Sequence, residues 1–350
     1  MFKSVLRWLN AAYTIVFYLV VTALTLALLL VCGLSCFGAA HLYCELSCHL
    51  IVLYLLAAFF VLLVVGLDAA IFRRMSLIAR IDIGCLFLIL FYCGYKMAPL
   101  WMREDKAPQR ANLTFLHFNL HGDKNKDYES FTKQVADADP DIVMVSESSR
   151  EWSKVLAKKL EIKYPYFDKS GFKSEFGFYS KYPIKLYNLK EIEFVHRKRL
   201  FAQVVHPELG PITILLVHPV TPIFNFAARN EELALYPKEL KEFDTPRILV
   251  GDMNCTLWSP YYERMVKEGE LKDCERGFGF APTWPGVTVK PFITIDHFLV
   301  SKDLAVKDRR VLGYAGSDHL PVLVKLGLAE PLTASAAPGT APTTYLTHQR

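Results

Sequence analysis

The sequence predicts an α/β sandwich domain preceded by an all-helical membrane segment. Three long apolar runs fill the first 100 residues, whereas residues 101–350 alternate short strand-like runs with helical patterns. Charge is segregated too. Residues 1–100 hold six of the 40 Lys and Arg residues and three of the 35 Asp and Glu residues, which leaves residues 101–350 a net charge of +2. This near-neutral balance excludes a strongly basic domain that coats nucleic acid.

Three transmembrane helices are expected within residues 1–101, at approximately residues 11–38, 48–68 and 81–101. The first run has no charge from Trp8 to Ala40, which exceeds the roughly 20 residues that a hydrocarbon core requires. The third run contains Asp82 and Lys96, but both stand near its ends, where such side chains can reach the interface. The alternative for the third run is an interfacial helix or a helix of the protein core.

The orientation of these helices follows from the basic residues. Lys and Arg stand before the first run and between the second and third: Lys3, Arg7, Arg73, Arg74 and Arg80. The loop between the first and second runs, residues 40–49, has neither. Positive charge favours the cytoplasmic side, so the N-terminus is expected there. With three spans, everything after Trp101 is expected on the non-cytoplasmic side.

Cysteines divide between the two parts of the chain. Six lie in or beside the apolar runs, where a thiol serves as a small apolar packing group. Cys44 and Cys48 either pair in an oxidising loop or stay free. Cys255 and Cys274 of the second part either form an external disulfide or remain two free thiols, because their distance does not follow from the sequence.

The second part begins with a polar linker, residues 102–111, and continues as a domain over residues 112–328. Strands are expected at 113–120, 141–147, 176–180, 201–206, 212–218, 247–254, 295–301 and 321–326. Helical patterns lie between them, at 128–138, 149–160 and 227–240. Residues 329–350 are rich in Ala, Pro and Thr without periodicity, which is typical of a flexible tail.

Polar residues follow several apolar strands, where loops can converge on one cleft. They are Asn119, Glu147, His218, Asp252 and Asn254, joined by Asp296, His297, Asp318 and His319 around the last strands. Carboxylates hold hard cations through oxygen, amides bind phosphate oxygens, and His with Asp can move protons. Singly, each residue is better interpreted as a turn residue or a hydrogen-bonded structural group. Their joint occurrence in this order indicates metal-assisted phosphate chemistry.

Four motifs resemble the endonuclease/exonuclease/phosphatase family: DPDIVMVSE, VGDMN, IDHFLVS and GSDHLPV, with FGFYSKYPI and PTWP in support. The resemblance covers Asn112 to about Leu326 and is greatest to a bacterial membrane-anchored branch. It implies a four-layer α/β/β/α sandwich of the deoxyribonuclease-like type. It also implies a multi-pass protein of the bacterial inner membrane with its catalytic domain on the non-cytoplasmic side.

The resemblance implies a metal and phosphate site. Glu147 looks like the family's metal-binding Glu, and Asp318 would lie at the same metal, with Mg²⁺ as the cofactor and Mn²⁺ as an alternative. Asn119 and Asn254 would bind phosphate oxygens. His121 departs from the family pattern, because many members have Asn or Asp at that position.

The resemblance also implies catalytic roles. Asp252 would align or deprotonate the attacking water or assist the leaving group, and Asn254 would act beside it. His218 would stabilise the charged transition state. Asp296 would orient His319, which would act as a general base or a phosphate stabiliser depending on its protonation.

The expected function is a membrane-anchored, Mg²⁺-dependent phosphoesterase that hydrolyses phosphodiester bonds, nucleic acid included. The alternatives are a hydrolase of lipid head groups or small phosphoesters and a non-catalytic membrane scaffold. The expected partners are the lipid bilayer and a phosphorylated substrate, with no nucleotide cofactor and with the oligomeric state open. Basic clusters at 154–163, 197–199 and 307–310 could contact nucleic acid, although solvated surface is the preferred interpretation.

Overall fold

The computed structural model describes residues 2–72, 75–103, 108, 113–169, 172–244, 246–286 and 292–329. Three features predicted from the sequence lie wholly or largely outside these residues. Arg73 and Arg74 of the predicted cytoplasmic loop lie outside the described residues, as do most of the linker at 102–111 and nearly all of the tail at 329–350.

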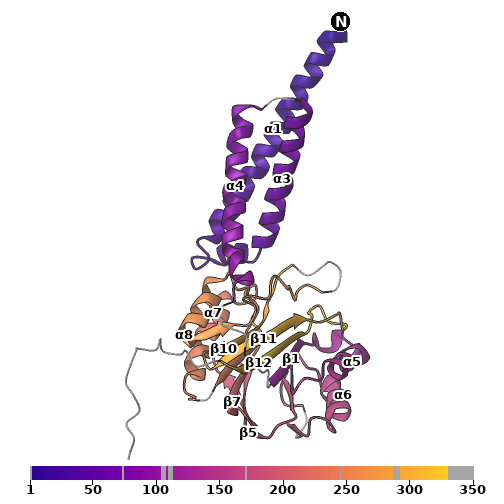
Figure 1. The fold of residues 1–350 in the computed structure, drawn as a ribbon, viewed down its shortest axis with the longest axis vertical. Helices are drawn as coiled ribbons and strands as arrows, with labels where there is room; N and C mark the ends of the chain where they lie inside the picture. The colour runs from indigo at the N-terminus through magenta and orange to yellow at the C-terminus, as the bar shows by residue number, and fades with distance from the viewer. Residues whose placement is uncertain are drawn as a thin grey trace, which may run out of the picture.

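The N-terminal part is a bundle of long helices (Figure 1): α1 (Phe2–Ser35), α3 (Ile51–Phe72) and α4 (Leu77–Met97). Within the described residues, three helical segments are long and apolar enough to cross a membrane, and the third expected run is among them. The acidic residues in these helices are buried inside the bundle. Asp82 accepts a hydrogen bond from Thr22 at 2.8 Å, and Asp68 accepts from Tyr13 at 3.0 Å. These partners explain how α3 and α4 tolerate carboxylates.

Two six-stranded sheets form the second part. One has the order β11 (Leu304–Val311), β12 (Val322–Leu328), β1 (Leu113–Asn119), β2 (Ile142–Ser146), β4 (Gly177–Ser180) and β3 (Tyr166–Phe167). The other has the order β5 (Ile184–Ile192), β6 (Arg197–His206), β7 (Gly210–Val217), β8 (Arg247–Asp252), β10 (Asp296–Ser301) and β9 (Leu271–Asp273). Each sheet contains one parallel pair, β1 with β2 and β7 with β8.

The sheets stack face to face with helices outside, which confirms the predicted four-layer α/β/β/α sandwich. The helices are α5 (Tyr128–Ala138), α6 (Arg150–Leu160), α7 (Phe226–Leu240) and α8 (Pro260–Gly269). Alternation along the strands sends neighbours to different layers, so Phe115 packs between the sheets and Leu116 packs with α5 and α6. Cys274 lies between the sheets but Cys255 lies in the layer of α7 and α8, and both thiols are free.

A buried polar junction joins the bundle to the second part. The short helix α2 (Leu42–Cys48) follows α1 and presents Glu45, which is fully buried. Its Oε1 lies 2.7 Å from Nη2 of Arg229 and accepts a hydrogen bond from Ser259 at 2.8 Å. His49 lies 3.2 Å from Glu45 and 2.9 Å from the Thr256 hydroxyl. The loop after β8 is therefore held against the end of the bundle.

The end of α4 makes further contacts with this part. A short 3-10 helix, η1 (Ala98–Trp101), continues α4, and the Leu100 carbonyl accepts hydrogen bonds from the amides of Gly277 and Gly279. The indole of Trp258 donates to the Lys96 carbonyl at 3.0 Å. Figure 1 shows α7 and α8 in the part of the domain next to the bundle. Two loops of the sandwich thus lie directly at the end of the apolar helices.

Candidate active site

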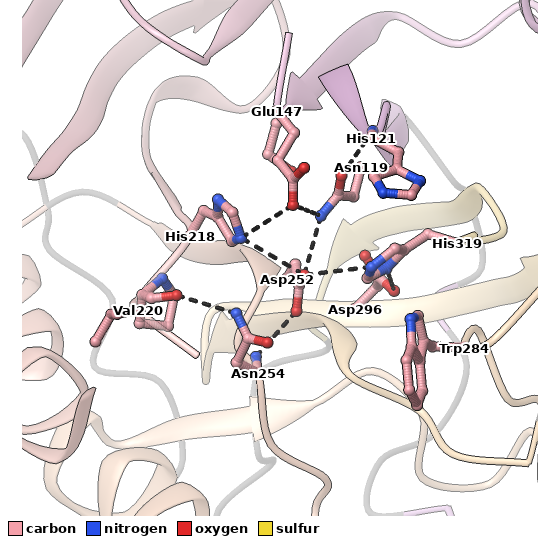
Figure 2. Close-up of polar contacts among 12 residues, drawn as sticks. Asn119, His121, Glu147, His218, Val220, Asp252, Asn254, Trp284, Asp296 and His319 are labelled. Carbon is pink, nitrogen blue, oxygen red and sulfur yellow. Dashed lines mark hydrogen bonds and ion pairs between the residues drawn. The ribbon is translucent and has the colours of Figure 1, made fainter. Parts of the chain in front are cut away.

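Five of the expected residues meet at one edge of the sandwich (Figure 2). Parallel pairing puts the carboxyl ends of β1 and β2 side by side, and it does the same for β7 and β8 in the other sheet. Asn119 and Asp252 end two of these strands, Glu147 and His218 directly follow the other two, and Asp296 begins β10 beside Asp252. The strand ends therefore bring together side chains that are far apart in the sequence.

Two carboxylates and an imidazole face one small volume. The Asn119 amide donates to Oε1 of Glu147 and to Oδ2 of Asp252, at 3.0 Å each. Nε2 of His218 lies 3.4 Å from Glu147 and 3.8 Å from Asp252. One ligand atom from each of Glu147, His218 and Asp252 lies within 4.8 Å of the others, and these residues could hold a metal ion. Glu147 also has a left-handed backbone, with φ of 49°, a conformation that bulky residues seldom adopt.

A second imidazole reaches Asp252 from the opposite side. Nδ1 of His319 lies 2.8 Å from Asp296, and its Nε2 lies 3.5 Å from Asp252. Burial by itself lowers the pKa of His319, but the Asp296 and Asp252 carboxylates outweigh it and raise this pKa to about 10. The pKa of Asp296 falls to about 2, because the charge of His319 overcomes the effect of burial. His319 is thus held as a charged proton donor.

Glu175 and Arg197 contact His218 at Nδ1, the ring nitrogen opposite the Nε2 that faces Glu147 and Asp252. Nδ1 of His218 lies 3.1 Å from Glu175, and Arg197 donates to both the His218 carbonyl and the Glu175 carboxylate. Burial opposes a charged imidazole, but the Glu175 contact prevails and raises the pKa of His218. Sequence reasoning missed Glu175, because no local motif connects it with a histidine 43 residues away.

The two asparagines are engaged with the protein. Asn254 donates to the Pro219 carbonyl at 3.0 Å, and its backbone amide donates to Asp252 at 2.9 Å. Asn119 uses its NH₂ group on the two carboxylates and accepts from the amide of His121 at 3.0 Å. Both side-chain amides lie next to the candidate metal cluster. Their expected contacts with phosphate oxygens stay a prediction.

Asp318, which was expected at the same metal as Glu147, is not one of the three residues of the candidate metal cluster. Its carboxylate is 2.8 Å from Nδ1 of His121 and accepts from the indole of Trp284 at 3.3 Å. His121 has a left-handed backbone with φ of 60°. The residue that departs from the family pattern is therefore the partner of a predicted metal ligand. Sequence reasoning did not anticipate this pair or the contact with Trp284.

The basic cluster at 197–199 is not an exposed turn between strands. It is the first part of β6, and Arg199 is buried in an ion pair with Glu239. Arg197 and Lys198 are both partly exposed, and Lys198 donates to the Lys173 carbonyl. Both guanidinium groups are paired within the domain, Arg197 with Glu175 and Arg199 with Glu239, and a contact of this cluster with nucleic acid stays a prediction.

A family model described as "Endonuclease/Exonuclease/phosphatase family" matches residues 116–319. The chain belongs to this family. No curated protein matches the chain. The members of the family are hydrolases, phosphatases and nucleases among them.

Solved structures share the fold. A family protein from Bacteroides thetaiotaomicron is 21% identical, with 62% of this chain and 98% of that chain covered and a TM-score of 0.53. A mannosyl-6-phosphatase from the same species is 20% identical, over 61% and 99% of the chains, with a TM-score of 0.52. D. rerio TDP2 complexed with single strand DNA product is 16% identical, over 61% and 98%, with a TM-score of 0.52. Identities this low establish the fold alone.

The donor set at the site fits the divalent metals that enzymes of this family generally use. Glu147 and Asp252 point at the same amide group, so their like charges lie close together and a cation between them would relieve the repulsion. A second group of possible metal ligands, formed by Asp273, Glu275 and His297, is buried in the domain. Arg309 lies 4.0 Å from Glu275 and already supplies positive charge there.

Proposed function

We propose that this chain is a membrane-anchored, divalent-metal-dependent phosphoester hydrolase. The observation that carries the proposal is the position of Asp252, which lies between two imidazoles and shares an amide donor with Glu147. This arrangement places a carboxylate, two hydrogen-bond donors and a candidate cation site around one point. A non-catalytic scaffold has no need of such a convergence.

Each residue of the site has its own role in phosphoester hydrolysis. Glu147 and Asp252 would hold Mg²⁺ or Mn²⁺, with Asp318 close by, and the ion would supply positive charge beside the phosphate. Asp252 orients the attacking water and accepts its hydrogen bond. His319 and His218, both biased towards the charged form, donate hydrogen bonds to the oxygens on which negative charge develops.

The proposal includes the membrane topology. The three apolar helices would cross the bilayer with Arg80 and the N-terminus on the cytoplasmic side, and the catalytic domain would lie on the other side. A reporter enzyme that is active only outside the cytoplasm, fused behind Arg350, should be active. Activity of a cytoplasm-only reporter at the same position would contradict this topology.

The central test uses the full chain in detergent with a chromogenic phosphodiester. Activity should require Mg²⁺ or Mn²⁺, and a chelator should abolish it reversibly. Asp252→Asn should lower turnover at least ~10²-fold. The control is Asp137→Asn, which removes an exposed carboxylate paired with Lys133. Full activity of the Asp252 variant, or full activity in excess chelator, would refute the proposal.

A further inference from the structure

The loop that follows β7 exposes two large apolar side chains. Ile223 and Phe224 have exposed fractions of 69% and 85%. Their backbone is ordered, because the amides of Phe224 and Asn225 both donate to the Thr221 carbonyl, at 3.0 and 3.2 Å. Adjacent exposed apolar side chains in a turn that is held by backbone hydrogen bonds are typical of an interaction surface. We call residues 219–225 the apolar loop.

The apolar loop is attached directly to the candidate active site. It begins next to His218, and its first residue, Pro219, accepts the hydrogen bond from the Asn254 side chain. The amide of Val220 donates to the Glu232 carboxylate at 3.0 Å. Whatever the apolar loop contacts is therefore brought close to the catalytic groups.

The other end of the apolar loop leads to the helix bundle. Asn225 caps α7, and the ring of Phe226 lies 5.6 Å from the ring of Tyr261. The Tyr261 hydroxyl donates to the carbonyl of Ala39, which connects α1 to α2. One turn further along α7, Arg229 pairs with Glu45 of α2. The loop thus lies on the side of the domain that faces the end of the apolar helices.

The connection between α1 and α2, together with the first turn of α2, also exposes aromatic rings. Phe37 and Tyr43 have exposed fractions of 67% and 70%. Exposed apolar side chains therefore occur on both sides of the junction, on the bundle and on the apolar loop. Ile162 after α6 and Phe194 between β5 and β6 are also exposed, but neither has a second exposed large apolar residue next to it in the sequence. Continuity with the apolar helices identifies the occupant of this surface as the bilayer that surrounds them.

We propose that Ile223 and Phe224 insert into the surface layer of the membrane and that the site hydrolyses phosphodiesters of membrane phospholipids. The substrate assignment rests on the proposed function. Burial of the two side chains among lipids removes apolar surface from water and holds the cleft at head-group depth. Water adds its oxygen to phosphorus while the bond from phosphorus to one alcohol oxygen breaks. One water proton ends on the departing alcohol and the other leaves the new phosphate.

A fluorescence experiment tests the membrane contact without using activity. Phe224→Trp is made in the full chain, with Ile162→Trp as the control, and each is reconstituted in nanodiscs of ordinary or brominated phospholipids. The emission that the new tryptophan adds over the parent chain is compared. It should fall at least twofold on brominated lipid for Phe224→Trp and stay unchanged for Ile162→Trp. Equal added emission at position 224 in both lipids would overturn the contact.

An activity experiment tests the substrate class. Turnover of phosphatidylethanolamine and phosphatidylglycerol in nanodiscs is divided by turnover of a soluble chromogenic phosphodiester, so that the amount of folded enzyme cancels. The double substitution of Ile223 and Phe224 by serine should lower this ratio at least tenfold, whereas Phe194→Ser should leave it unchanged. The substrate assignment is overturned if the parent chain cleaves the soluble diester or single-stranded DNA but neither lipid. Absence of any turnover would instead refute the proposed function, and the fluorescence result would still decide the contact.

Discussion

Arg229→Met should destabilise the junction between the bundle and the catalytic domain by about 3–5 kcal/mol. Both Arg229 and Glu45 have side chains that are 0% exposed, and their nearest charged atoms are 2.7 Å apart. Methionine removes the positive charge but keeps most of the side-chain volume. The Glu45 carboxylate is then buried with less compensation, which is the situation in which breaking a buried ion pair costs this much.

The pKa of Glu45 reflects the stabilisation that His49 and Arg229 provide together. Burial alone would raise its pKa, but His49 and Arg229 lower it from the ordinary 4.5 to about 2. A difference of this size corresponds to about 3 kcal/mol. Because the folded-state pKa lies below the ordinary value, this stabilisation is present above pH 4.5 and is lost as the pH falls towards 2. The acid stability of the parent chain should therefore decline across this interval more steeply than that of a Glu45→Gln variant.

Thermal unfolding of the full chain in nanodiscs, followed by near-ultraviolet circular dichroism, measures the effect. For a domain of this size, the expected loss lowers the midpoint by roughly 6–20 °C. Removing both charges, with Glu45→Gln in addition to Arg229→Met, should restore part of the loss. Arg264→Met, which breaks an exposed pair with Glu268, is the control and should shift the midpoint by less than about 2 °C. A midpoint for Arg229→Met within the range of this control would refute the reasoning.

The remaining predictions concern the site. His319→Gln should lower turnover at least ~10²-fold without unfolding the domain, and near-parent activity in a steady-state assay would remove His319 from the mechanism. The folded-state pKa of His319 lies above the ordinary 6.5, so the stabilisation from its charged form is present below pH 6.5 and is lost as the pH rises through about 10. Denaturant titrations at several pH values should show this loss in the parent chain and not in His319→Gln. Arg197→Ala should lower turnover of a small soluble phosphodiester about tenfold, or ~1.4 kcal/mol, by releasing His218, whereas Lys198→Ala should change it less than twofold.

The elements that bury a continuous apolar face could be predicted from the sequence. The helix expected at 128–138 is α5, with the same bounds, and the core strands β1, β2, β7, β8, β10 and β12 all coincide with expected runs. The missed strands are β3, β5, β9 and β11, which are the edge strands of the two sheets. An edge strand with an exposed face carries charges at intervals, so its sequence shows no apolar run. Charged residues such as Lys307 and Arg310 therefore interrupt the apolar pattern by which β11 could have been predicted from the sequence.

The candidate site could be predicted as far as strand ends determine it. Asn119 and Asp252 end strands, and Glu147 and His218 directly follow strands. Parallel pairing brings such residues together whatever their distance along the chain. Strand pairing does not predict the contact of Glu175 with His218. Glu175 precedes a short strand and reaches the histidine only because β4 and β7 belong to different sheets whose ends meet at the candidate active site.

Arg197 shows why composition alone misleads about the substrate. Three basic residues in a row indicate a surface for anions, but alternation along β6 sends Lys198 to one side and its two neighbours to the other. Arg197 then binds the His218 carbonyl and Glu175, and Arg199 binds Glu239. Two of the three charges are neutralised within the domain, which lowers the number of cations available to a nucleic-acid backbone. The loop that begins next to His218 instead exposes large apolar side chains, at Ile223 and Phe224.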